Sequence, residues 1–124
     1  MGYNMELSRT MWRAMFSGVM TDSDLLEMVK TVRALGNGGP VASPNGLVDL
    51  SGLTEIILTF DTLSSIGREA QGISLQDKIK IAIIANSPAQ FGYARMFQTL
   101  LNHDQIDLHV FLEDERGALD WLSK

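Results

Sequence analysis

The strongest constraint on the fold is a strand-to-helix step near the end of the chain. Residues 106–112, Ile-Asp-Leu-His-Val-Phe-Leu, begin with the alternation of apolar and polar side chains that is typical of a strand. Residues 113–122 follow at once, and their acidic side chains precede apolar ones at helical spacing, which predicts a capped helix. Domains built from βα repeats usually close in this way, so the step predicts an α/β fold.

The rest of the chain predicts four more strands and three more helices. Strands are expected at 3–8, 11–17, 47–50 and 78–85, with the first two joined as a hairpin by a short polar turn. Helices are expected from Thr21–Asp24 to Leu35, from about Thr59 to Gln71, and from Pro88 to about Leu101. Successive βα units after the hairpin imply parallel strands with right-handed crossovers. If the strands lie in sequence order, the crossover helices share one face and the other face is comparatively open.

Residues 36–46 are the one segment that the sequence marks as irregular. Four glycines and two prolines there are incompatible with a regular helix or strand. Such a segment is either a lid over a site or a surface connection, and we favour the surface connection.

Composition excludes several classes of protein. A chain of 124 residues predicts a single domain, 1–124. A net charge of -5 argues against a nucleic-acid partner and against an anionic membrane surface, because both attract clustered Lys and Arg. There is no cysteine, no apolar run of membrane-spanning length and no secretory leader at the start, so we expect a cytoplasmic protein.

Several of these features together resemble a known family. They are the element order, the Leu-Val-Asp-Leu-Ser-Gly-Leu run at 47–53, the isoleucine-rich strand at 78–85 and the closing segment 113–122. The chain resembles the SpoIIAA-like proteins, small stand-alone relatives of STAS domains. The resemblance implies superhelical βα units on a mixed, mostly parallel five-stranded sheet. It also implies a regulatory role, since the family includes anti-sigma factor antagonists that bind a partner kinase.

The antagonists of this family carry a phosphorylated Ser in an Asp-Ser-Ser-Gly sequence, shortly after a strand that ends in Asp-x-Ser. Residues 49–51 resemble that strand end. Residues 57–60, however, read Ile-Leu-Thr-Phe, so the phosphoryl switch is not carried over to this chain. Thr59 is the nearest hydroxyl.

The carboxyl ends of the parallel strands are where an α/β sheet usually binds a ligand. Ser51, Asn86 and Ser87 follow two of these ends, beside helix N-termini that suit anions, and could hold a small anion or other ligand. The alternative, which we favour, is that Ser87 only caps its helix. Glu113 and Asp114 at the next strand end would repel an anion.

Charged side chains on one face of the predicted sheet raise the question of catalysis. Alternate residues of a strand point to opposite faces, and Asp49, Lys80 and His109 share one face on neighbouring strands, while the other face is uniformly apolar. They could transfer protons, but a surface ion-pair network is the better interpretation, since no nucleophile accompanies them. His103 and His109 lack the spacing of metal ligands. We therefore expect no enzymatic activity, no metal and no cofactor.

The second strand is the candidate interface. Apolar side chains on both of its faces, beside an edge strand, favour self-association as a homodimer; they are Met11, Trp12, Met15 and Phe16. The alternative is that the first helix or the glycine-rich segment folds over this strand within one chain.

Two functions follow from these patterns. The leading one is a non-enzymatic regulatory domain that binds itself and a regulatory protein. The other is a carrier for a small apolar ligand or lipid, held between helices and sheet. A large flat apolar patch would favour the first function, and an apolar-lined pocket would favour the second.

Overall fold

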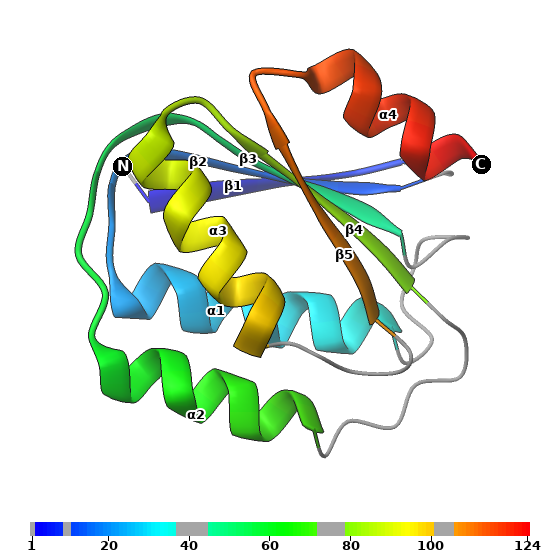
Figure 1. The fold of residues 1–124 in the computed structure, drawn as a ribbon. Coiled ribbons are helices and arrows are strands. Elements are labelled where there is room, and N and C mark those ends of the chain that lie inside the picture. Colours follow the sequence, from blue (N-terminus) through cyan, green and yellow to red (C-terminus); the bar gives the residue numbers. More distant parts are fainter. Residues whose placement is uncertain (1, 9–10, 37–44, 72–78, 101–105) are drawn as a thin grey trace.

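The fold is a five-stranded sheet with helices on both faces (Figure 1). The structure is a computed structural model, and it describes residues 2–8, 11–36, 45–71, 79–100 and 106–124. The elements are, in chain order, β1 (Gly2–Leu7), β2 (Trp12–Met20), α1 (Asp22–Gly36), β3 (Gly46–Ile56), α2 (Phe60–Gln71), β4 (Ile79–Ala85), α3 (Pro88–Leu100), β5 (Ile106–Leu112) and α4 (Glu115–Ser123).

The strands lie in the sheet in their sequence order, β1-β2-β3-β4-β5. β1 and β2 pair antiparallel, and every later neighbour pairs parallel. The expected fold class, a mixed and mostly parallel sheet in an α/β protein, is therefore confirmed. The turn at 9–10 and residues 37–44 of the glycine-rich segment lie outside the described residues.

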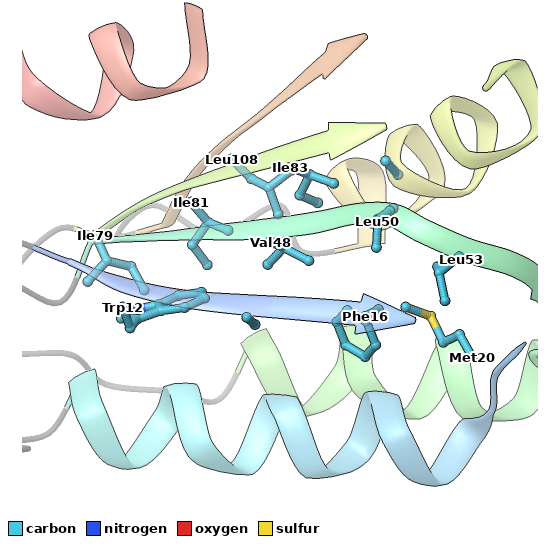
Figure 2. Packing of buried hydrophobic residues seen from close by; sticks show 12 residues of the cluster. Trp12, Phe16, Met20, Val48, Leu50, Leu53, Ile79, Ile81, Ile83 and Leu108 are labelled. Carbon is cyan, nitrogen blue, oxygen red and sulfur yellow. The ribbon is translucent and has the colours of Figure 1, made fainter. Parts of the chain in front are cut away.

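The larger hydrophobic core lies between the sheet and the helices α1, α2 and α3 (Figure 2). The sheet face that the sequence shows as uniformly apolar is turned toward this core. Its side chains include Val48, Ile81 and Leu108. α1 and α3 pack against the sheet, whereas α2 packs mainly against these two helices. Leu63 and Ile66 of α2 are buried with Leu25 of α1 in a cluster of their own. The helical layer is thus two deep over this part of the sheet.

A smaller core lies on the opposite face, which the sequence predicted to be open. Leu47, Ala82 and Ile84 are buried there beneath Ala118 of α4, and Trp121 packs against them. α4 follows the last strand of the sheet and packs over this face, opposite α1, α2 and α3 (Figure 1). None of the helices in the described ranges is long and apolar enough to cross a membrane.

β2 and β3 are longer than the sequence predicts. β3 was expected to end at Leu50 and the chain was expected to leave the sheet at Gly18, yet the two strands stay paired to Met20 and Ile56. The register shifts around Ser17 and Val19, where Gly18 has a φ of 71°. These shifts allow β2 and β3 to remain paired beyond Ser17 and Gly18. Pairing with a neighbouring strand overrides weak local propensity here.

Two of the four residues proposed for an interface are buried within the chain. Trp12 is 0% exposed and Phe16 is 2% exposed, because α1 and the sheet enclose them. Covering by the first helix, the alternative interpretation, therefore holds for these two residues. Met15 of β2 and Met11, which precedes this strand, lie on the other face of the sheet and are half-buried.

Candidate functional site

An apolar cavity lies between the sheet and the three helices of the larger core. It has a volume of about 90 Å³ and is lined by β2, β3, β4, β5, α1, α2 and α3. Ala94 of α3 is 1% exposed and lines it, so a small side chain stands where a larger one would fill space. Trp12 and Val48 line it from the sheet, and Ile66 of α2 lines it from the outer helical layer. The cavity thus has the sheet on one side and residues of α1, α2 and α3 on the other.

A second, polar groove lies at the carboxyl end of the sheet. The last pair between β3 and β4 is Asp49 with Ile84, so β3 continues beyond its partner strand. This continuation and the start of α3 form the walls of a groove of about 450 Å³. Ser51, Asn86 and Ser87, the three residues that the sequence singled out, all line it. The sequence rule for ligand sites in α/β sheets therefore brought together residues that are close in space.

Two backbone donors at this helix start, those of Asn86 and Gln90, are already used by the chain. The Ser87 hydroxyl oxygen accepts a hydrogen bond from the Gln90 backbone N–H at 3.2 Å, so Ser87 caps α3. Gln90 joins this helix start to β3: its Oε1 accepts from the Asn86 N–H at 2.6 Å, and its Nε2 donates to the Leu53 carbonyl at 3.3 Å. Sequence reasoning missed Gln90, although the Ser-x-x-Gln spacing at 87–90 is a capping-box signature. These contacts fit the cap interpretation of Ser87.

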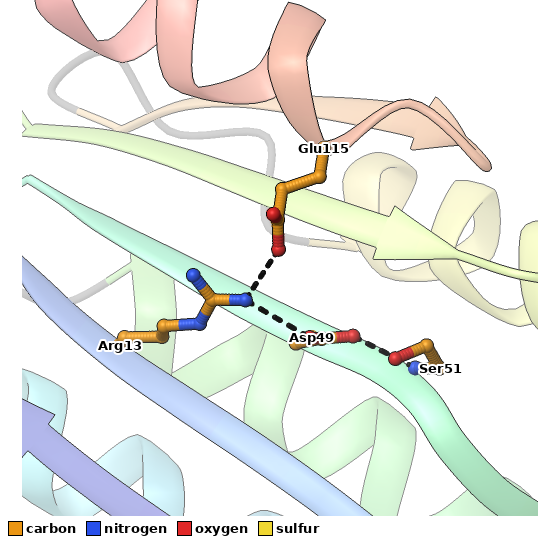
Figure 3. A network of polar contacts seen from close by, with 4 residues as sticks. All are labelled: Arg13, Asp49, Ser51 and Glu115. Carbon is orange, nitrogen blue, oxygen red and sulfur yellow. Dashed lines mark hydrogen bonds and ion pairs between the residues drawn. The ribbon is translucent and has the colours of Figure 1, made fainter.

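An ion-pair network lies on the α4 face of the sheet (Figure 3). Arg13 of β2 contacts Asp49 of β3 at 3.2 Å and Glu115 of α4 at 2.5 Å. Asp49 also accepts a hydrogen bond from the Ser51 backbone N–H at 2.9 Å. The bond to Glu115, and after it the contact with Asp49, raise the pKa of Arg13 against the opposing effect of burial. The network ties the first turn of α4 to the centre of the sheet.

Asp49 has a pKa below its ordinary value. Burial is the largest single influence and works to raise it. Hydrogen bonds from Ser51 and the contact with Arg13 together outweigh burial, so the carboxylate stays ionised to lower pH.

The structure does not bring Asp49, Lys80 and His109 into one network. Lys80 donates to the Trp121 carbonyl at 3.3 Å and lies over the indole ring, with its Nζ 5.3 Å from the ring centroid. His109 stacks on the same indole, with 4.5 Å between centroids, and its Nε2 lies 3.6 Å from Asp107 Oδ1. Lys80 and His109 therefore hold Trp121 in place, while Asp49 pairs with Arg13. Arg13, which shares the strand parity of Asp49 on the neighbouring strand, is the partner that sequence reasoning missed.

Thr59, the hydroxyl nearest to the position of the phosphorylated Ser, links two helix starts. Its backbone N–H and its hydroxyl donate to the two oxygens of Asp22, each at 3.0 Å. Its oxygen also accepts from the Thr62 N–H at 3.3 Å. The N–H of Thr59 is the main reason that the pKa of Asp22 lies below its ordinary value. We refer to this pair as the Asp22–Thr59 clasp, which joins the start of α1 to the start of α2.

The sheet order, its single antiparallel pair and the four helices define a SpoIIAA-like, STAS-type fold. A crystal structure of an uncharacterized DUF3478-family protein with a SpoIIAA-like fold, from Shewanella loihica PV-4, matches with a TM-score of 0.60 and 21% identity, covering 98% of this chain and 94% of that one. The anti-sigma factor antagonist SpoIIAA in its unphosphorylated form matches with a TM-score of 0.55 and 13% identity, covering 98% of each chain. No family model and no curated protein matches the chain.

These likenesses concern the fold, since both identities are low. Within the described ranges, no group of three or more His, Cys, Asp or Glu side chains could hold a metal ion. The features left for a function are the apolar cavity, the polar groove and the surface around the Asp22–Thr59 clasp.

Proposed function

We propose that this STAS-type domain is a non-enzymatic binding protein that holds a small apolar ligand in the cavity between its helices and sheet. The cavity of about 90 Å³, with its almost entirely apolar lining, is the observation that carries this proposal. An empty cavity costs stability at roughly 24 cal/mol per Å³, so this one costs about 2 kcal/mol when unfilled. An apolar ligand that fills it regains much of this free energy. The carrier function is therefore favoured over the regulatory one.

The volume limits the size of the ligand. An engineered cavity of about 150 Å³ with similar apolar walls stays dry and binds benzene. The present cavity is smaller, so it suits an aromatic ring or a short alkyl group. A longer chain cannot lie wholly inside it, because the sheet and the helices α1, α2 and α3 form its walls.

A titration with toluene, followed by NMR of the methyl groups, tests the proposal. Signals of cavity residues such as Val48 and Ile81 should shift in the wild type. Ala94→Leu places extra carbon atoms in the cavity and should abolish these shifts, and Val48→Leu should weaken them. Arg95→Leu is the matched control, since Arg95 lies next to Ala94 on α3 but is exposed and lines neither the cavity nor the groove. Absence of toluene binding to the wild type, or equal binding to Ala94→Leu, would contradict the proposal.

A regulatory interaction is a second candidate, supported by one surface feature. Ile57 is 53% exposed and Phe60 is 77% exposed, next to the Asp22–Thr59 clasp. Large apolar side chains that stay in water near a helix start suit a protein contact. In a pull-down, Phe60→Ser should lose a specific regulatory partner that the wild type retains, while Leu119→Ser on the exposed side of α4 should keep it. Retention of the same partner by Phe60→Ser would remove this candidate.

A further inference from the structure

We infer that the natural ligand is amphipathic, with its apolar part in the cavity and an uncharged hydrogen-bonding head in the polar groove. This inference rests on the proposed carrier function and adds the chemical class of the ligand. The cavity and the groove share two wall residues, Ile56 of β3 and Tyr93 of α3. A ligand can therefore extend from one space into the other past these two side chains.

Tyr93 is suited to the boundary between the two spaces. It is the only hydroxyl-bearing side chain among the described residues that line the cavity. Its ring is half-buried, and its hydroxyl makes no hydrogen bond to another described residue. An aromatic ring with a free polar end typically bridges apolar and wet surroundings. Tyr93 can thus contact the apolar part of a ligand with its ring and the head with its hydroxyl.

The groove offers a second unused polar group. Ser87 and Gln90 are occupied by the helix cap, and the Thr54 hydroxyl donates to the Gly18 carbonyl at 3.1 Å. The Asn86 side-chain amide has no hydrogen-bond partner in the described part of the chain. An amide both donates and accepts, so Asn86 and Tyr93 together can satisfy a hydroxyl or amide head.

The charges of the groove favour an uncharged head. Glu55 is the one charged side chain among its described lining residues, and none of them is Lys, Arg or His. A carboxylate or phosphate head would face Glu55 without a cation to offset it. A cationic head would face the positive end of the α3 dipole, which has no acidic residue in its first turn. An alcohol or amide meets neither obstacle.

Three ring compounds of similar size separate these possibilities: toluene, benzyl alcohol and benzoate. Binding of each is measured by NMR titration to the wild type, Tyr93→Phe, Asn86→Ala and Glu55→Gln. Tyr93→Phe removes only the hydroxyl. It should therefore lower the affinity for benzyl alcohol by about threefold to tenfold, the range of one neutral hydrogen bond. Toluene should bind this variant as it binds the wild type. Asn86→Ala should also lower the affinity for benzyl alcohol and leave that for toluene unchanged.

Benzoate should bind the wild type more weakly than benzyl alcohol does, and Glu55→Gln should narrow this gap. Equal effects of Tyr93→Phe and Asn86→Ala on toluene and benzyl alcohol, or no effect on either, would overturn the assignment of the head to the groove. Benzoate binding as tightly as benzyl alcohol would overturn the uncharged head. Either result, together with toluene binding to the wild type, would still support the proposed carrier function. Failure of toluene to bind the wild type would refute that function itself.

Discussion

Asp49 links residue-scale electrostatics to the stability of the fold. Its pKa in the folded chain lies below the ordinary value of 3.8, because Ser51 and Arg13 outweigh the effect of burial. A carboxylate with a lowered folded pKa contributes stability above its unfolded pKa and loses that contribution as the pH falls through its folded pKa. The contribution of Asp49 is therefore complete at neutral pH and is lost below about pH 4.

Asp49→Asn should lower the free energy of unfolding by about 1–2 kcal/mol at pH 7, because hydrogen bonds to a charged group are replaced by weaker ones. The deficit should shrink at pH 3, because the Asp49 carboxylate of the unfolded wild type takes up a proton below about pH 4, which favours unfolding. Urea unfolding at both pH values measures it. Asp120→Asn, at an exposed carboxylate on α4, is the control and should change little at either pH. A deficit that is equal at both pH values would show that Asp49 does not act through its charge.

Two glycines should respond in opposite ways to the same substitution. A Cβ on Gly46 would overlap the indole ring of Trp12, which is itself fully buried. Gly46→Ala should therefore destabilise the fold by about 1–3 kcal/mol through overpacking. A Cβ on Gly92, within α3, would meet nothing within 4 Å, so Gly92→Ala should stabilise it by about 0.5–1 kcal/mol. Thermal unfolding of both variants measures these changes. A Gly46→Ala variant as stable as the wild type would contradict the contact between Gly46 and Trp12.

Single residues were predicted well where a general rule applies and poorly where packing decides. Ser51, Asn86 and Ser87 follow strand ends, so chain order alone brought them to one groove. The second strand has apolar residues on both faces, and such a run does not reveal which face will be covered. The burial of Trp12 by α1 was therefore not predictable from the pattern, and neither was the pairing of Arg13 with Asp49.

At the scale of elements, α4 depends on one aromatic anchor. Trp121 is stacked by His109, lies 6.0 Å from Phe111 between ring centroids, and is covered by Lys80. Trp121→Ala should destabilise the protein by about 2–3 kcal/mol, less than for a fully buried Trp because Trp121 is partly exposed. Leu119→Ala, on the exposed side of the same helix, should cost less than about 1 kcal/mol. Denaturant unfolding measures both, and equal costs would mean that Trp121 does not anchor α4.

Strand and helix types follow from the sequence more surely than their ends do. The isoleucine-rich β4 was predicted at 78–85 and is found at Ile79–Ala85, because all of its side chains except Lys80 are apolar. β3 was predicted at 47–50 and extends to Ile56, since its second half has polar residues and is held by β2 alone. Such pairing with a distant part of the chain is not visible in the local pattern of residues 51–56.

For the whole molecule, self-association stays a prediction that rests on the second sheet face and the β1 edge. Met15 is half-buried on that face, away from the cover of α1, and β1 has no neighbour on its outer side among the described strands. We expect a homodimer at micromolar concentration, and Met15→Glu should shift it to monomer in sedimentation velocity experiments, because a charge is poorly tolerated in an interface core. Leu119→Glu on α4 is the control. A wild-type monomer would contradict the prediction.

The fold class was predictable because several weak signals agree along the chain. Each βα unit implies a parallel neighbour, and the resemblance in element order to SpoIIAA-like proteins is confirmed by the likeness of fold to solved structures. The apolar cavity was not predictable beyond its general place, because it depends on how α2 seats on α1 and α3 rather than on any single residue.

The sequential order of the strands has a consequence for synthesis on the ribosome. Each strand lies beside the one that precedes it, so an emerging strand finds its partner already made and none has to be inserted later between two others. The parallel pairs nevertheless join residues far apart in the sequence, such as Ala14 with Val48, and pairing of this kind forms more slowly than the helices do. The second face is completed last: Leu47, Ala82 and Ile84 are buried beneath α4, which follows all five strands. A nascent chain that has completed its sheet but not α4 therefore exposes an apolar surface. At this stage it is prone to aggregation, which a chaperone can prevent.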